Sequence, residues 1–140
     1  MEFFEIHQQP LNLMHHAPRV KWSPPAMGGY KANFDVAFFY NSELAGLGVV
    51  VRDNSGNIMG VLSQKISRPQ SVEHAEALAA RRAMILVKEL MLFQVCFEGD
   101  CQQVIQAINK PSACRTLFGH IIEEIRCFSS FLVGCSFLHV

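Results

Sequence analysis

The stretch that most constrains the fold runs from Tyr30 to Tyr40 and reads YKANFDVAFFY. Its residues alternate with the period of a β-strand. The two faces of this strand carry Ala32, Phe34, Val36 and Phe38, and Lys31, Asn33, Asp35 and Ala37, respectively. Asp35 is unusual because a short carboxylate packs poorly inside a strand and competes for backbone hydrogen bonds. A solvated outer face and a carboxylate held rigidly for chemistry both explain it, and this stretch alone does not decide between them.

Composition places the chain among globular proteins of one domain. It has 140 residues, of which 50% are hydrophobic and 17% are charged, which is typical of a chain that buries a core. Twelve basic residues balance twelve acidic ones. This neutrality removes the long-range attraction that drives nonspecific nucleic-acid binding, so such a partner has to be recognised locally.

The cysteines and the apolar segments indicate in which cellular compartment the protein is found. The five cysteines form no CxxC pair, which favours reduced, mostly buried thiols in an intracellular protein. The N-terminal residues lack the apolar core of a secretory signal, and the segment 128–140 is too short to span a bilayer. We therefore expect an intracellular protein without a membrane partner, and the sequence does not distinguish a nuclear from a cytoplasmic location.

The first part of the chain predicts a linker. Prolines cluster before residue 29 without a clear period, so we expect residues 1–21 to form a linker or disordered segment and residues 22–140 to form the domain. His15 and His16 could bind a metal ion. A solvated loop is the favoured interpretation because adjacent residues on such a segment rarely make a site alone.

Two further strands are predicted after the first. They run from Gly46 to Asp53 and from Ile58 to Ile66, and the turn-forming residues 53–57 lie between them. Short connections make the three strands an antiparallel meander. Gly46 and Gly48 do not indicate a phosphate-binding loop, because they lead into a strand and not into a helix.

A long helix is predicted from Val72 to Leu92. One of its faces carries Val72, Ala75, Glu76, Ala79, Ala83, Leu86, Val87 and Leu90. Glu76 is the exception on this apolar face, and a buried glutamate is costly unless it is paired or bound to a cation. Glu76 is therefore a second carboxylate that needs an explanation.

Asp100 ends the next predicted strand, residues 93–100, and precedes a short helix that begins with CQQVIQAIN. It is well placed to cap that helix, with Gln103 at the capping-box position. The carboxyl end of a strand is also where α/β sheets bind ligands. Both interpretations stay open, because a carboxylate has two oxygens.

The remaining elements complete an α/β fold. We expect a helix over residues 115–128, with an apolar stripe that includes Leu117 and Phe118, and a final strand over residues 131–140. The order is βββ-α-β-α-α-β. Right-handed crossovers would make the last two strands parallel to the first, which gives a five-stranded mixed sheet flanked by helices.

Asp35, Glu76 and Asp100 are thus expected to converge on one side of the sheet. Converging carboxylates repel each other unless hard divalent cations such as Mg²⁺ or Mn²⁺ neutralise them. Such a cluster suits two-metal hydrolysis of a phosphodiester. No serine, cysteine or histidine arrangement offers an equally coherent nucleophilic site.

Five segments in order carry a family resemblance, and they cover about residues 22–140. They are WSPPAMGGYKANFDVAFF, AGLGVVVRDNSGNIMG, EHAEALAARRA, FEGDCQQVIQAIN and FLHV. Together they resemble the plant ribonuclease H-like domains of the type 1 ribonuclease H family that are related to non-LTR retroelements and associated with their reverse transcriptases.

The resemblance implies a ribonuclease H-like fold with strand order 3-2-1-4-5 and metal-dependent endonucleolytic cutting of the RNA strand of RNA–DNA hybrids. It matches Asp35, Glu76 and Asp100 to the family's catalytic, metal-binding carboxylates, with two Mg²⁺ or Mn²⁺ ions as cofactors. RNA–DNA hybrid or another nucleic acid is the implied partner. Four basic residues could neighbour its phosphates, although a solvated face is the favoured interpretation of each: Lys31, Arg52, Arg81 and Arg82.

The sequence departs from the family at three places. Val36 follows the first aspartate where glycine is common, and Cys101 follows the third acid where serine is common. The family continues past its HV motif into a final helix with a fourth carboxylate, whereas this sequence stops at Val140. We therefore expect a C-terminally truncated domain with the final helix missing, hybrid cleavage that is weak or absent, and no assigned role for His139.

Two rival functions remain from the sequence. The first is a non-catalytic nucleic-acid-binding module that keeps the fold. The second is a protein-interaction domain that self-associates through its exposed final strand. Cleavage of a hybrid in magnesium separates the enzyme from both rivals.

Overall fold

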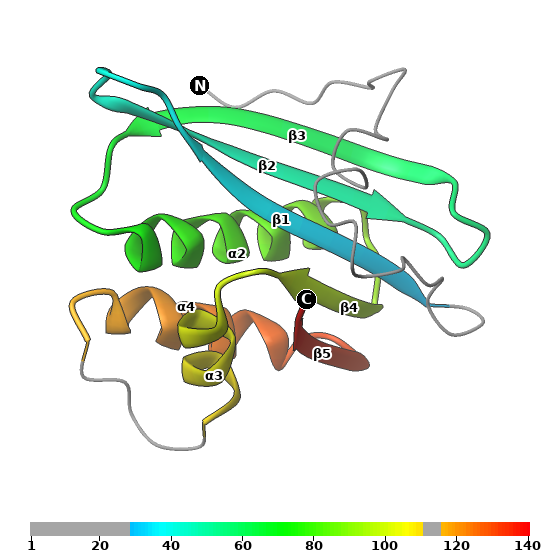
Figure 1. Ribbon diagram of the computed structural model, residues 1–140. Helices are drawn as coiled ribbons and strands as arrows, with labels where there is room; N and C mark the ends of the chain where they lie inside the picture. Colours follow the sequence, from blue (N-terminus) through cyan, green and yellow to red (C-terminus); the bar gives the residue numbers. More distant parts are fainter. Residues whose placement is uncertain (1–28, 111–115) are drawn as a thin grey trace.

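The computed structural model describes residues 29–110 and 116–140, which form one five-stranded mixed sheet with helices (Figure 1). The strand order is β3-β2-β1-β4-β5, as predicted. The elements are β1 (Tyr30–Phe38), β2 (Leu44–Arg52), β3 (Ile58–Ser67), α2 (Val72–Glu89), β4 (Gln94–Gly99), α3 (Gln102–Asn109), α4 (Gly119–Ser129) and β5 (Gly134–His139). The predicted linker, the domain boundary at residue 22 and the His15–His16 pair lie outside the described residues.

The first three strands form the predicted antiparallel meander. β1 pairs with β2 from Lys31↔Arg52 to Phe38↔Ala45, and β2 pairs in turn with β3. The turn between β2 and β3 is fixed by Asp53, whose Oδ1 accepts hydrogen bonds from the backbone N–H groups of Ser55 (2.9 Å) and Asn57 (2.8 Å). An aspartate at the start of a turn has this effect because its short side chain reaches the backbone two residues on.

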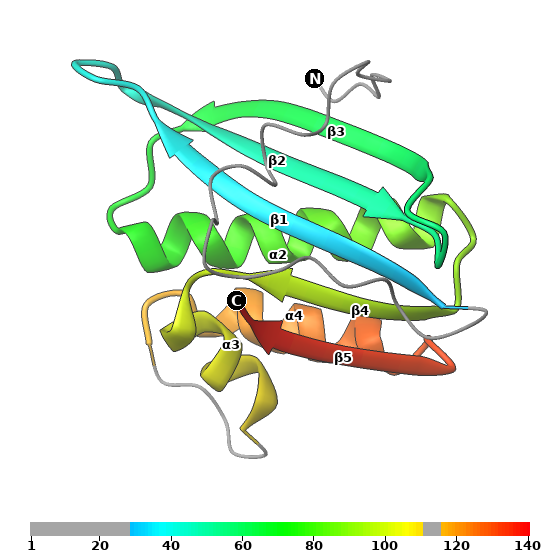
Figure 2. The same cartoon turned by 45° about the vertical axis from the view of Figure 1, so that its right-hand side comes forward.

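The last two strands run parallel to β1. β1 pairs with β4 from Tyr30↔Val95 to Asn33↔Glu98, and β4 pairs with β5 along its whole length. Figure 2 shows the arrows of β1, β4 and β5 pointing toward the same end of the sheet. The predicted crossovers are therefore confirmed, and they leave β1 between an antiparallel and a parallel neighbour.

The core lies between the sheet and α2, with α4 beside α2 (Figures 1 and 2). α2 approaches the sheet closely because its buried face is rich in alanine. The prediction that Val72 and Leu117 belong to the buried apolar stripes of their helices is wrong, because these residues are 55% and 83% exposed. Both precede or begin a helix, and α4 begins four residues later than expected because residues 116–118 belong to a turn.

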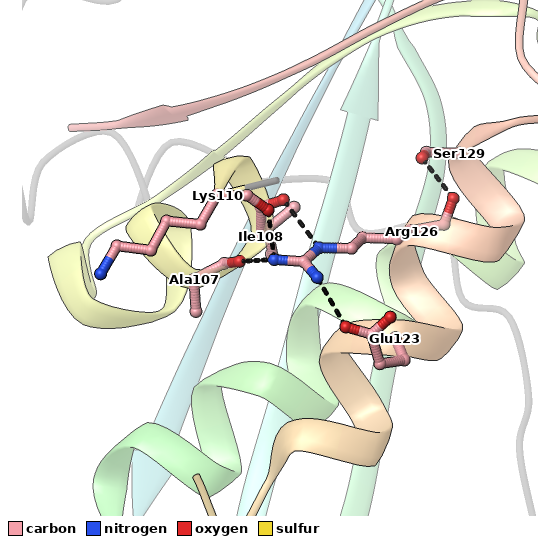
Figure 3. Close-up of polar contacts among 6 residues, drawn as sticks. All are labelled: Ala107, Ile108, Lys110, Glu123, Arg126 and Ser129. Atoms are coloured by element: carbon pink, nitrogen blue, oxygen red, sulfur yellow. Dashed lines mark hydrogen bonds and ion pairs between the residues drawn. The ribbon is translucent and has the colours of Figure 1, made fainter. Parts of the chain in front are cut away.

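Arg126 joins the two C-terminal helices (Figure 3). Its guanidinium on α4 donates to the carbonyl of Ile108 at 3.2 Å and also to those of Ala107 and Lys110, at the C-terminal end of α3. The last carbonyls of a helix have no partner within the helix, so this side chain satisfies them from outside. Glu123, one turn away, holds the guanidinium in place through an ion pair. No local pattern in the sequence indicates this role of Arg126.

β5 is the edge strand of the sheet, and the final strand is only partly as exposed as expected. Leu138 is half exposed, and Phe131 and Val133 before the strand are strongly exposed. Phe137 is buried, however, because its ring stacks on Phe97 with centroids 4.7 Å apart.

Two further expectations concern the state of the cysteines and the absence of a membrane-spanning segment. The four described cysteines are free thiols, as predicted, but three are half-buried and Cys127 is exposed, so their expected burial is wrong. None of the described helices is both long and apolar enough to span a membrane.

Candidate functional site

Asp35, Glu76 and Asp100 come from three different elements and meet in one cluster. Each offers a carboxylate oxygen, and these oxygens all lie within 4.8 Å of one another. The geometric prediction of convergence is therefore confirmed. We call these three residues the carboxylate cluster.

Strand register explains how the two aspartates meet. The last residues of β1 and β4 that pair are Asn33 and Glu98, and Asp35 and Asp100 each lie two positions beyond them. The two carboxylates are therefore carried past the point where pairing of these parallel strands ends. Openings of this kind, where the strand order reverses, are where α/β sheets bind ligands.

Gly99 fixes the approach of Asp100, a role that the sequence analysis did not identify. A Cβ atom at Gly99 would lie only 2.4 Å from Cζ of Phe34, whose ring packs over this position. Only glycine fits beneath the ring, so β4 ends close to β1 and directs the next residue, Asp100, toward Asp35. A glycine immediately before an aspartate at a strand end was the available signal.

Glu76 reaches the cluster from α2. It lies in the second turn of the helix between residues such as Ala75 and Ala79, which are fully buried and leave room for close packing against the sheet. The residue is only 3% exposed. Its Oε2 atom has no hydrogen-bond partner among the residues that the structure describes.

Burial and like charge both act on Glu76. Desolvation, and then the carboxylates of Asp100 and Asp35, raise the pKa of Glu76 from 4.5 to about 8, and a hydrogen bond with Asp100 favours the protonated form further. The apo cluster therefore holds a proton on Glu76 at neutral pH. Asp35 gains some compensation, because its Oδ1 accepts a hydrogen bond of 2.8 Å from the backbone N–H of Val36.

The cluster fits a divalent cation. Carboxylate oxygens are the donors that Mg²⁺ and Mn²⁺ prefer. The Oε2 atom of Glu76 has no hydrogen-bond partner among the described residues, and burial among like charges raises the pKa of its carboxyl. A cation at this point would relieve both. Asp35, Glu76 and Asp100 would hold such an ion, and Glu76 would release its proton to do so.

The predicted helix cap at Asp100 is wrong. α3 begins at Gln102, its N-cap residue is Cys101, and no side chain caps it through a hydrogen bond. Asp100 therefore lies one residue too early to cap the helix. This outcome favours the ligand-binding interpretation over the capping one.

His139 and the cluster are neighbours. Nε2 of His139, at the end of β5, lies 3.1 Å from the backbone carbonyl oxygen of Asp100. The pairing of Gly99 with His139 in adjacent parallel strands brings the two residues together. The sequence analysis assigned His139 no role.

The basic residues near the sheet are mostly buried, so the solvated-face interpretation is wrong for Lys31, Arg52 and Arg82. Lys31 forms an ion pair with Glu98 at 3.2 Å, and Arg82 forms one with Glu89 at 3.6 Å. Burial lowers the pKa of Arg52. The fourth residue, Arg81, is half-buried and pairs with Glu124 at 3.3 Å. Local patterns could not reveal the partners of Lys31 and Arg81, which lie far away in sequence, whereas Glu89 lies on the same helix as Arg82.

Solved structures share this fold at low sequence identity. Ribonuclease H1 from the halophilic archaeon Halobacterium salinarum superposes with a TM-score of 0.72 and 21% identity, over 80% of this chain and 85% of that one. The N-terminal ribonuclease H domain of a Mycobacterium tuberculosis protein gives 0.71 and 15%, over 80% and 81%. LC11-RNase H1, solved in complex with an RNA/DNA hybrid, gives 0.68 and 19%, over 79% and 84%. These likenesses establish a ribonuclease H fold.

Sequence comparison identifies the family. A search of curated proteins found no significant match. The family model described as "Reverse transcriptase-like" matches residues 33–140, which is most of the chain and includes all three members of the carboxylate cluster. The chain therefore belongs to the reverse transcriptase-like family and is a ribonuclease H-like domain.

Proposed function

We propose that this domain hydrolyses the RNA strand of RNA–DNA hybrids with divalent cations held by Asp35, Glu76 and Asp100. The observation that carries the proposal is the meeting of three carboxylate oxygens within 4.8 Å around a buried, unsatisfied oxygen of Glu76. Burial of like charges destabilises a fold, and this cost is understandable where a cation is bound. The fold shared with LC11-RNase H1, whose structure contains an RNA/DNA hybrid, supports the choice of substrate.

Each of the three carboxylates is positioned by a different element of the fold. Asp35 lies on the central strand and Asp100 just past its parallel neighbour, so the sheet sets the distance between them. Glu76 closes the cluster from the helix side, where its carboxyl is buried. Two bound Mg²⁺ or Mn²⁺ ions would supply an activated water and stabilisation of the leaving oxygen. The protein's own contribution is to place three carboxyl groups before the substrate arrives.

We also propose that the domain is of the retroelement-associated type found in plants. The five ordered segments that resemble those domains support this origin, and the reverse transcriptase-like family is consistent with it. Two positions depart from the resemblance: Val36 and Cys101 flank the cluster where the resembled domains have smaller or more polar residues.

Cleavage of a labelled hybrid tests the proposed function. An RNA–DNA hybrid with a fluorescent RNA strand is incubated with the protein in Mg²⁺, in Mn²⁺ and in EDTA. We expect cleavage of the RNA strand only with a divalent ion, and a loss of at least about 100-fold in Asp35→Asn and Asp100→Asn, because each removes a charge from the cation site.

Glu124→Gln is the matched control. Glu124 is also an acidic residue, but it lies on α4 in a surface ion pair with Arg81, so its loss should leave cleavage unchanged. Hybrid binding by the folded wild type without cleavage in either metal would contradict the enzymatic proposal and favour a non-catalytic binding module. Cleavage that survives Asp35→Asn would contradict the assigned site.

A further inference from the structure

The turn between β1 and β2 exposes aromatic side chains at one end of the molecule. Phe38, Phe39 and Tyr40 are consecutive, and the last two are 40% and 92% exposed. Large apolar side chains that gather on a surface usually mark a contact site.

Backbone contacts hold this turn in one conformation. The N–H of Ser42 donates to the carbonyl of Phe39 at 3.2 Å, and Oγ of Ser42 accepts from the N–H of Leu44 at 3.1 Å. Asn41 adopts a positive φ of 53°, which asparagine tolerates better than most residues. Tyr40 is thereby displayed on a defined turn, which lowers the entropic cost of using it for binding.

Arg68 adds a cation to the same place. It follows β3, and its backbone N–H donates to the carbonyl of Glu43 at 2.6 Å. Its guanidinium donates to the carbonyl of Ser42 at 3.2 Å and lies over the ring of Phe38, 4.8 Å from the centroid. We call Phe38, Phe39, Tyr40 and Arg68 the aromatic turn.

The aromatic turn lies at the same end of the sheet as the carboxylate cluster. Figure 2 shows the β1–β2 turn and the start of α2 on the side toward which β4 points. Asp35 and Tyr40 are five residues apart, which corresponds to about 15 Å of extended chain, or about four to five nucleotide steps. A nucleic acid that contacts the cluster can therefore extend to this turn.

We propose that the aromatic turn stacks an unpaired nucleobase of a strand that continues beyond the hybrid held at the carboxylate cluster. The inference rests on the proposed function and names a finer substrate class, a hybrid with a single-stranded extension. Exposed aromatic rings stack on any base, and a neighbouring arginine attracts the phosphates between bases. The positive charge of Arg68 beside the rings complements the phosphates of a nucleic acid, and this complementarity is the reason for choosing that partner.

Binding to two labelled hybrids tests this inference. Both have the same duplex, but one carries a single-stranded extension of about six nucleotides. Affinity is measured by fluorescence anisotropy in EDTA, where cleavage does not occur, for the wild type, Tyr40→Ala and Tyr40→Trp. Phe131→Ala is the matched control, because Phe131 is also an exposed aromatic residue, 66% exposed, but belongs to the α4–β5 connection.

We expect the wild type to bind the extended hybrid about 5- to 100-fold more tightly than the blunt one, the range typical of one stacked base. Tyr40→Ala should remove this preference, Tyr40→Trp should retain it, and Phe131→Ala should not change it. Equal preference in the wild type and Tyr40→Ala would overturn the inference, as would equal weakening of both hybrids. A change in oligomeric state in Tyr40→Ala, measured by light scattering, would instead assign the turn to protein contact and also overturn it.

The cleavage assay separates this test from that of the proposed function. A protein that cleaves hybrids through Asp35 but ignores Tyr40 refutes only the stacking role. A protein that prefers the extended strand through Tyr40 but cleaves neither hybrid refutes only the enzymatic function. No binding to either hybrid in EDTA, together with no cleavage in Mg²⁺ or Mn²⁺, refutes both.

Discussion

Two groups of polar side chains lie next to each other along β1 and β4, and each includes one buried charged residue, Lys31 in the first and Glu76 of α2 in the second. The two groups differ in one respect. In the first, Lys31 pairs with Glu98 at 3.2 Å, and Nδ2 of Asn33 donates to the same carboxylate at 3.2 Å. The second is the carboxylate cluster, which begins two residues farther along both strands and gathers three acids. The two strands thus hold an ion pair at one point, and just beyond it they bring two aspartates toward the buried carboxyl of Glu76.

The difference between the two groups shows which feature distinguishes a functional site from a structural ion pair in this domain. Burial and polarity are common to both groups, so neither property marks the site. Only in the carboxylate cluster do like charges converge and raise a pKa, and that arrangement costs stability in the absence of a ligand. The Lys31–Glu98 pair should therefore serve the fold, and the cluster should serve binding and catalysis.

Removing Glu98 should have the largest effect on folding. Glu98→Ala removes the carboxylate that pairs with the buried Lys31, and it should lower the free energy of unfolding by about 3 kcal/mol because breaking a buried ion pair is strongly destabilising. Urea denaturation measures this value. Glu124→Gln, which breaks the surface pair with Arg81, should cost less than about 1 kcal/mol. Equal losses in the two variants would contradict the structural role of the buried pair.

The metal-free protein should lose stability as the pH rises from about 4.5 to about 8. The folded protein keeps the proton of Glu76 up to about pH 8, whereas the unfolded chain releases it near 4.5. The folded state therefore binds more protons within this window, and linkage makes each increase in pH unfavourable to folding. We expect the titration of Glu76 to lower the free energy of unfolding by about 2 kcal/mol across this window. This value is smaller than the full pKa shift would give, because water at the exposed Asp100 screens the repulsion.

Unfolding in EDTA across this pH range measures the Glu76 contribution, and Glu76→Gln serves as the reference. The difference in stability between this variant and the wild type should grow with pH and become constant above about pH 8. A difference that does not vary with pH would show that Glu76 does not titrate in this window.

Asp35→Asn should have a smaller effect of the opposite sign to Glu98→Ala. At pH 8.5 in EDTA, where Glu76 is largely ionised, removing one of three like charges should raise the free energy of unfolding by about 1 kcal/mol. Thermal or urea unfolding measures this gain. A loss of stability of similar size would show that the other contacts of Asp35 outweigh the repulsion in the cluster.

Much of the fold could be predicted from the sequence, because local patterns and turn residues determine it. Alternation identified β1, Asp53 to Asn57 identified the turn after β2, and the order of elements gave parallel β4 and β5. Glu76 could be identified as a site residue because a carboxylate conflicts with an alanine-rich face. Such local conflicts mark functional positions in otherwise consistent sequences.

Features that depend on distant partners could not be predicted in this way. The burial of Lys31 depends on Glu98, 67 positions later, and the role of Gly99 depends on the ring of Phe34. Asp100 was a plausible helix cap from the local sequence, but α3 begins at Gln102 and its N-cap is Cys101. Helix boundaries shift by a residue or two with context, so the sequence could not fix this one. The role of Arg126 likewise requires α3 and α4 to pack together.

Metal-linked stability tests the central claim most directly, namely that the carboxylate cluster is a divalent-cation site. Urea unfolding is compared in EDTA and in MgCl₂ at pH 7.5 for the wild type, Asp35→Asn and the control Glu124→Gln. At a free Mg²⁺ concentration 100 times the dissociation constant, the wild type and the control should both gain about 2.7 kcal/mol. Asp35→Asn should lose most of this gain. An equal gain in all three proteins, or none in the wild type, would contradict the assignment of the cluster as a metal site.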